Sequence, residues 1–290
     1  MKRTQWVAIL ALLLAAGATM SARIAQNAGA IGAGYAAKQI CSGVFVARLP
    51  EHFVLNTDVL PRLATVAPLP HLLSYNVDTQ QRTVTARMLG QKVRVEHQPT
   101  SGCTLLSEDA LSARSQLETP AHYVYLARKA ADSTLPVSAI NPAIRKALNT
   151  AFAEPPEGGR NTLAVIVMHR GEIVAERYQT PVTINTPMQG WSMNKSLMAT
   201  FIGQQIDRGR LSLDDSVAEA LKTAGAEASL VSLVSPDLNL GHLLSMTSGF
   251  DFAERYFPGD DVTDMLYREP GMWLSAPATG HARAPGEQFA

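Results

Sequence analysis

The sequence lacks an excess of either charge and has few cysteines. Its 290 residues carry 25 basic and 25 acidic side chains, so the formal net charge is zero. No long basic run is present of the kind that indicates nucleic-acid binding. Charged residues make up 17% of the chain and apolar residues 46%, a balance that excludes extensive disorder. The length allows one large domain or two smaller ones.

Only two cysteines are present, Cys41 and Cys103. They do not form a Cys–His cluster with the spacing of a metal site, and we expect neither a metal ion nor another cofactor. In an oxidising compartment an even number of cysteines favours a disulfide, and two free buried thiols are the alternative. Such a disulfide closes a loop of about 60 residues, which stabilises the fold by roughly 4 kcal/mol in the chain-entropy model.

The N-terminus has the pattern of a targeting segment. Lys2 and Arg3 precede the apolar run WVAILALLLAA, and no charged residue occurs from Thr4 to Ala22. A basic start, an apolar core and small residues (AGA) are typical of a secretory signal, and the uncharged stretch is also just long enough to span a membrane. We expect residues 1–22 to be a cleaved signal or an inner-membrane anchor, rather than a buried core helix. Either leaves Lys2 and Arg3 inside and predicts a periplasmic protein.

The rest of the chain divides into stretches that differ in composition and in hydrophobic pattern. Val84, Ala86 and Met88 alternate with polar residues, which is the pattern of half-buried strands. The Ala/Gly-rich stretch before them has a composition typical of a tether. We therefore expect a tether at 23–42, a small β-rich region at 43–106, a linker or short helices at 107–139 and a larger domain at 140–290.

The larger domain is predicted to begin with a helix and a hairpin. Asn141 is a plausible N-cap, with Pro142 at the first helical position. Two apolar runs, 162–169 and 172–178, are joined by Arg-Gly and favour a tight hairpin. The first run is continuously apolar, so we expect its strand to be buried on both faces.

Helices are predicted to follow the hairpin. Apolar residues recur every four positions from Met193, in two adjacent stripes, up to Gly209. The sequence SLDD resembles a capping box with Ser212 as N-cap. LNLGHLLSMTSGF favours a short helix that ends at Gly249. A helix, a hairpin and then several helices indicate an α+β fold.

The stretch GWSMNKSLMAT places Ser192 and Lys195 three residues apart at a predicted helix start. Such residues lie on one helix face and can meet. Backbone N–H groups at a helix start can donate to an oxyanion. A lysine loses its proton at neutral pH only if it is desolvated, and we expect Trp191, Met193 and Met198 to pack over this one. Ser192 would then be a nucleophile with Lys195 as its base. The alternative is that Ser192 only caps the helix and Lys195 is a solvated surface residue.

Several ordered segments carry a family resemblance: GWSMNKSLMATFIGQQIDRGRLSLDDSV, LNLGHLLSMTSGFDFAERY and PGEQF. Together they resemble the serine β-lactamase-related superfamily, which includes class C β-lactamases, DD-peptidases, esterases and 6-aminohexanoate-dimer hydrolases. The segments most resemble those of the 6-aminohexanoate-dimer hydrolases. The resemblance covers roughly residues 140–290. It implies Ser192 as nucleophile, Lys195 as general base, and an antiparallel sheet flanked by helices with a helical lobe. We expect Trp191 to contact substrate.

The same resemblance assigns other polar residues to structure. His242 is expected to be a packed helix residue rather than an acid or base. Asp251, Glu254 and Tyr256 are expected to be loop residues near the mouth of the cleft.

The family also uses a Tyr-x-Asn or Tyr-x-Ser segment just after PGE-x-F, and later a Lys/His-x-Gly strand. The sequence stops at Ala290, directly after PGEQF, and Tyr256 and Tyr267 come too early to replace that tyrosine. We therefore expect a truncated form that is nearly inactive by itself. The leading hypothesis is a serine hydrolase acting on a small amide or ester. The alternative is a penicillin-binding or sensor module, or a decayed remnant.

Overall fold

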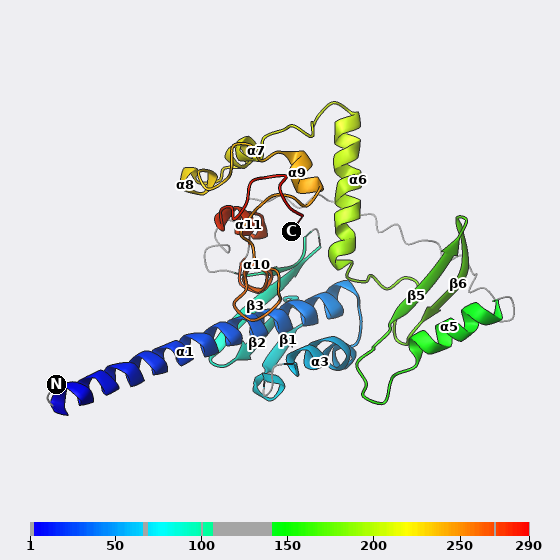
Figure 1. The fold of residues 1–290 in the computed structure, drawn as a ribbon. Helices are drawn as coiled ribbons and strands as arrows, with labels where there is room; N and C mark the ends of the chain where they lie inside the picture. Colours follow the sequence, from blue (N-terminus) through cyan, green and yellow to red (C-terminus); the bar gives the residue numbers. More distant parts are fainter. Residues whose placement is uncertain (1–2, 66–68, 100, 107–140, 270, 290) are drawn as a thin grey trace. The chain divides into compact units, whose positions relative to one another are not determined.

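The chain forms a mixed α+β structure with two antiparallel sheets (Figure 1). The computed structural model describes residues 3–65, 69–99, 101–106, 141–269 and 271–289. Two compact units divide the chain, residues 1–188 and residues 189–290, so the boundary falls inside the domain expected at 140–290. The predicted linker or short helices at 107–139 lie outside the described residues.

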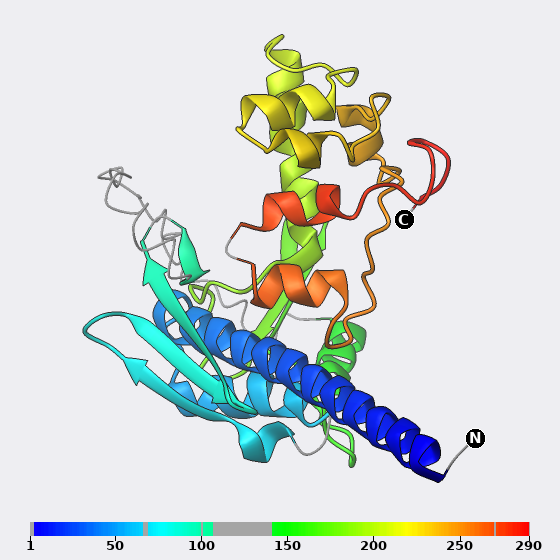
Figure 2. The same ribbon diagram turned by 90° about the vertical axis from the view of Figure 1, so that its left-hand side faces the viewer.

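A long helix packed on a four-stranded sheet forms the first part of unit 1. Helix α1 spans Arg3–Cys41. The strands are β1 (Ser74–Asp78), β2 (Thr83–Met88), β3 (Gln91–Gln98) and β4 (Gly102–Leu105), and each pairs with the next in antiparallel fashion. Figure 2 shows α1 running across one face of this sheet. The inward side chains of the strands alternate with outward ones, and their core includes Val84, Ala86, Met88, Val95 and Leu105.

The prediction of a tether at 23–42 is wrong, because this stretch is the second half of α1. Its residues from Ile31 to Cys41 are mostly buried against the sheet. The small residues permit close approach: a Cβ added to Gly29 would lie 2.6 Å from the carbonyl oxygen of Met88. Ala and Gly therefore mark a tight helix–sheet contact here, whereas the sequence pattern suggested a linker.

The region predicted as β-rich at 43–106 is helical in its first part. Five short helical segments precede the sheet: η1 (Ser42–Val46), α2 (Glu51–Val54), η2 (Leu55–Val59), α3 (Leu60–Leu63) and η3 (Leu69–Leu72). Strands occupy 74–105, with Val84 opposite Val77 and Val95. Cys41 and Cys103 form a disulfide that joins the end of α1 to β4, with Cα atoms 6.0 Å apart, as predicted.

Helix α5 (Pro142–Phe152) and the hairpin β5 (Ala164–His169)–β6 (Glu172–Tyr178) complete the described elements of unit 1. The Asn141 side chain caps α5 by accepting a hydrogen bond from the Ala143 N–H at 2.8 Å, as the sequence predicted. Leu148 of α5 packs on Ala175 of β6. The strand 164–169 was expected to be buried on both faces, and this is wrong: Ile166 and Met168 are 51% and 64% exposed, because α5 packs on the other side chains of the hairpin.

Unit 2 consists of short helices around a small core. Its elements are η6 (Trp191–Met193), α6 (Asn194–Asp207), α7 (Val217–Thr223), α8 (Ala228–Val231), α9 (Leu240–Leu244), α10 (Asp261–Tyr267), η7 (Met272–Leu274) and α11 (Ser275–Ala278). The core is built from the buried residues Val217, Leu221, Val231, Val234 and Leu238.

The start of α7 differs from the one predicted. Ser212 and Asp215 form a turn, in which the Ser212 N–H donates to Asp215 Oδ2 at 2.9 Å. The helix begins at Val217 and is capped by Ser216, whose hydroxyl accepts from the Glu219 N–H. The sequence offers the same Ser-x-x-acid pattern at 212–215 and at 216–219, so the pattern alone does not select the cap.

Within the described residues, no helix has both the length and the hydropathy needed to cross a membrane.

Candidate active site

The segment before α6 turns sharply at Trp191. The Met193 N–H donates to the Gly190 carbonyl at 3.0 Å, and Trp191 adopts a φ of +44°. A bulky residue in the left-handed region costs on the order of 1–3 kcal/mol and is seen where the surrounding structure fixes it, often at functional sites. This turn delivers Ser192 to the first turn of the helical segment η6–α6.

Ser192 and Lys195 meet as the helical spacing predicts. Lys195 Nζ donates a hydrogen bond to Ser192 Oγ at 3.1 Å. The two side chains come from successive elements, η6 and α6, which follow each other without a break. The Ser192 hydroxyl and the Lys195 side-chain nitrogen are therefore in direct contact.

The side chains expected to shield this pair do not cover it. Trp191 is 50% exposed, Met193 72% and Met198 57%, so water has access to the Ser192–Lys195 pair. The two predicted apolar stripes are not covered either, because no residue of α6 is buried. Leu197 and Phe201, which continue one predicted stripe, are 56% and 54% exposed.

Two other segments singled out by the sequence lie against each other in unit 2. The Gly286 N–H of the PGEQF stretch donates to the Thr247 carbonyl at 2.8 Å. The Ala282 N–H donates to the Gly249 carbonyl at 3.0 Å. Gly249 has a φ of +75°, and a Cβ there would collide with the Arg283 carbonyl. The MTSG and PGE motifs therefore form one structural feature that depends on glycine.

His242 has the structural role that the sequence predicted. Its N–H donates to Asn239 Oδ1 at 3.0 Å, and its Nδ1 accepts from the Asn239 N–H at 3.4 Å. These reciprocal bonds cap α9. Glu254 and Tyr256 lie in a loop, where the Tyr256 hydroxyl donates to Glu254 Oε1 at 3.0 Å.

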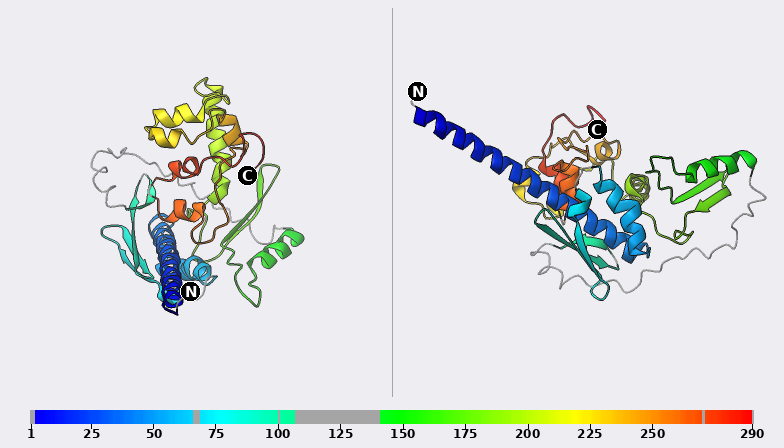
Figure 3. Two further views of the ribbon diagram at one scale, coloured as in Figure 1. Left: turned by 60° about the vertical axis from the view of Figure 1, so that its left-hand side comes forward. Right: turned by 90° about the horizontal axis from the view of Figure 1, so that it is seen from below.

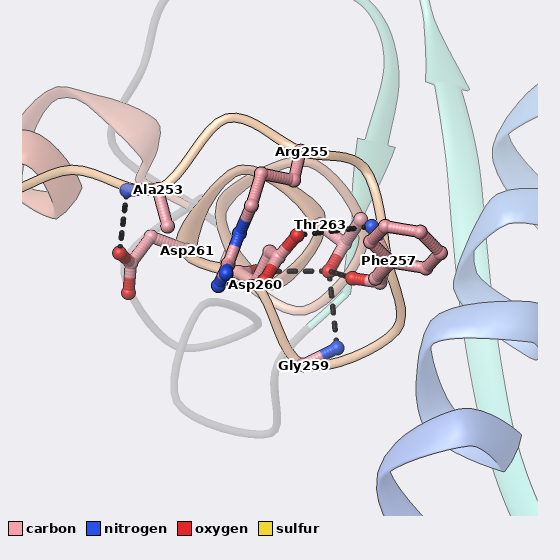
Figure 4. Close-up of polar contacts among 7 residues, drawn as sticks. All are labelled: Ala253, Arg255, Phe257, Gly259, Asp260, Asp261 and Thr263. Carbon is pink, nitrogen blue, oxygen red and sulfur yellow. Dashed lines mark hydrogen bonds and ion pairs between the residues drawn. The ribbon is translucent and has the colours of Figure 1, made fainter.

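A buried carboxylate that sequence reasoning missed organises the loop before α10 (Figure 4). Asp260 is 7% exposed. It accepts from Arg255 Nη2 at 2.8 Å and from the Phe257 N–H at 3.0 Å. Thr263 donates to the Phe257 and Asp260 carbonyls. Only the adjacent pair Asp260–Asp261 after Pro-Gly hints at this role in the sequence.

No group of three or more His, Cys, Asp or Glu side chains within the described residues is placed to hold a metal ion.

The site residues lie inside a match to a known family. The β-lactamase family profile covers residues 145–289, and the chain belongs to this family. A penicillin-binding protein 4 from Amycolatopsis lactamdurans is 38% identical over 114 residues, which is 38% of this chain and 27% of that protein. The match thus spans about a quarter of that relative. Membership implies chemistry of the serine hydrolase or transpeptidase type.

Proposed function

We propose that the chain is a serine hydrolase that cleaves a small amide or ester through an acyl-enzyme on Ser192, with Lys195 as general base. The hydrogen bond of 3.1 Å between Lys195 Nζ and Ser192 Oγ carries this proposal, together with its place in the family match. Hairpin β5–β6 with α5 would begin the flanked antiparallel sheet of the family fold, and the helices of unit 2 would belong to its helical lobe.

The proposed reaction needs few groups. Ser192 Oγ attacks the carbonyl carbon while its proton moves to Lys195 Nζ, which must be in the amine form. A substrate lying over Trp191 and Met193 would displace water and favour that form, because desolvation disfavours an ammonium. The proton then passes to the leaving amine or alkoxide, and water hydrolyses the ester on Ser192.

Several features limit the substrate and the location. The half-exposed Trp191 next to Ser192 offers an apolar surface to a small molecule. The resemblance of SMNKS and FAERY to 6-aminohexanoate-dimer hydrolases favours a linear amide or an ester over a β-lactam.

The N-terminal segment and the disulfide favour the periplasm, whether residues 1–22 are cleaved or remain as an inner-membrane anchor. We propose no nucleic-acid partner and no cofactor.

A penicillin-binding module is the second candidate, favoured by the similarity to a penicillin-binding protein over 114 residues. Such a module would be acylated at Ser192 and would not turn over. The two candidates share the nucleophile and differ only in the fate of the acyl-enzyme.

Covalent labelling tests both candidates. In this experiment the chain is incubated with a fluorophosphonate or with a fluorescent penicillin. We expect peptide mass spectrometry to find an adduct on Ser192. Ser192→Ala should abolish labelling, and Lys195→Ala should slow it by about 10²–10⁴-fold, the usual contribution of a general base. Release of the label with repeated ester or amide turnover indicates the hydrolase, and a stable stoichiometric adduct indicates the penicillin-binding module.

Two matched control variants test whether labelling depends specifically on Ser192 and Lys195. Ser196→Ala removes a hydroxyl one turn along α6, and Lys222→Ala removes an ammonium that pairs with Glu219 in α7 at 2.6 Å. Both should label like the unmodified chain. Unchanged labelling of Ser192→Ala would refute the assignment of Ser192, whereas no labelling of the unmodified chain would favour the decayed remnant over both candidates.

A further inference from the structure

The hairpin between β2 and β3 places two cations opposite each other. Arg87 pairs with Lys92 across the strands, and both side chains are exposed. Within the described residues the side chain of neither one has a hydrogen bond or ion pair. Arg94, two residues along β3, is exposed on the same face of the sheet. Like charges directly opposite are unfavourable in a sheet, so this pair indicates a site for an anionic partner.

Helix α1 leaves the sheet at this same end. Gly29 of α1 lies against the β2–β3 hairpin, where an added Cβ would be 2.6 Å from the Met88 carbonyl oxygen. Residues 17–27, which precede this contact, are all exposed. The right-hand view of Figure 3 shows the N-terminal half of α1 extending beyond the strands.

Exposed apolar side chains accompany the cations. Met20 and Ile24 of α1 are 63% and 62% exposed, and Leu89 at the tip of the hairpin is 37% exposed. A soluble polyanion would contact the cations alone. An anionic membrane surface would contact both, because its headgroups attract cations and the acyl boundary accepts apolar side chains.

The spacing along α1 fits a membrane surface. An α-helix rises about 1.5 Å per residue, so Ala22 lies roughly 10 Å along the axis from Gly29. The uncharged stretch of the sequence ends at Ala22. The polar headgroup layer on each side of a bilayer is about 5–8 Å thick. When the uncharged stretch meets the apolar layer, the hairpin tip therefore lies close to the headgroups.

We propose that the β2–β3 hairpin, with Arg87 and Lys92, binds the anionic phospholipid headgroups of a membrane that the N-terminal half of α1 also contacts. The net charge of the chain is zero, so this attraction is local to the hairpin. The inference is independent of the chemistry of Ser192 and shares with the proposed function only the export of the chain.

Vesicle flotation with the 290-residue chain tests the proposal. The chain should bind vesicles of phosphatidylcholine that contain a third of phosphatidylglycerol more strongly than vesicles of phosphatidylcholine alone. The double variant Arg87→Gln/Lys92→Gln should lower the partition constant on the anionic vesicles by roughly tenfold to thirtyfold, from the usual contribution of each basic residue at such a surface. High salt should produce a similar loss.

The matched control is Arg48→Gln/Arg82→Gln, which removes two exposed arginines near the opposite end of the same helix and sheet. It should bind like the unmodified chain. Equal loss in both double variants, equal binding to the two kinds of vesicle, or binding of soluble polyphosphate without binding of vesicles would each overturn the proposal. Circular dichroism and the intact disulfide establish that each variant is folded.

Discussion

His97 is held in an environment that disfavours its charged form. Its ring lies on β3 beside Phe45, with ring centroids 6.0 Å apart. Its Nδ1 is buried and has no hydrogen-bond partner within the described residues. Burial lowers the pKa of His97, and the positive charge of Arg82 lowers it further. The neutral ring is therefore part of the folded state of the first sheet.

This shift predicts a loss of stability in mild acid. The unfolded chain binds a proton at His97 below a pH of about 6.5, whereas the folded state resists it. The contribution to stability is thus present above pH 6.5 and is lost as the pH falls below that value. Urea midpoints of unit 1 should fall between pH 7 and pH 5, and His97→Gln should reduce that fall.

His71→Gln provides the comparison, because His71 is exposed in η3 of the same unit. It should leave the pH dependence of the midpoint unchanged. A fall in the midpoint that is equally steep in the His97 variant would show that another group causes the acid sensitivity.

Residue contacts were predictable where sequence spacing determines them. The Ser192–Lys195 contact follows from helical spacing, and the Asn141 cap follows from its place before Pro142. The role of Asp260 did not follow, because its partners Arg255 and Phe257 are brought to it by the loop. The exposure of Met193 and Met198 was not predictable either. An apolar helix face indicates a tendency to be buried, but the pattern does not show which other element, if any, packs on that face.

At the scale of elements, glycine conformation decides how MTSG meets PGE. Gly249 combines a φ of +75° with a backbone neighbour, the Arg283 carbonyl, where a Cβ would stand. Gly225, after α7, has a similar φ of +84° and open space around it. The two glycines therefore separate the cost of backbone conformation from the cost of a steric collision.

Gly249→Ala should accordingly destabilise unit 2 more than Gly225→Ala. The left-handed conformation alone costs about 1–2 kcal/mol for a residue with a Cβ. A collision with backbone atoms adds roughly 1–3 kcal/mol. We expect the free energy of unfolding, measured in urea, to fall by about 1–2 kcal/mol for Gly225→Ala and by roughly 2–5 kcal/mol for Gly249→Ala. Equal losses would mean that the two segments separate easily.

Elements were predicted best where local signals agree. Helix α5 and hairpin β5–β6 combine a cap, periodicity and a tight turn, and they appear near the expected positions. The stretch 23–42 failed because small residues are common both in linkers and in closely packed helices. Residues 43–72 failed because short helical segments leave no clear period in the sequence.

At the scale of the whole molecule, the chain consists of two compact units, each with a core of its own. The disulfide belongs to unit 1 and the Ser192–Lys195 pair to unit 2. Units with separate cores can unfold in separate steps. The stability of one unit and the chemistry of the other should therefore be separable by experiment.

The double variant Cys41→Ala/Cys103→Ala tests this separation. The disulfide closes a loop with a sequence separation of 62, and the chain-entropy model gives a loss of about 4 kcal/mol when it is removed. Hydrogen exchange should show this loss in α1 and the first sheet, with protection in α7 and α9 unchanged. Labelling of Ser192 should proceed at the rate of the unmodified chain, and reduction of the unmodified chain should reproduce both results. Slower labelling after removal of the disulfide would show that the two units are energetically coupled, because a change confined to unit 1 would then reach Ser192.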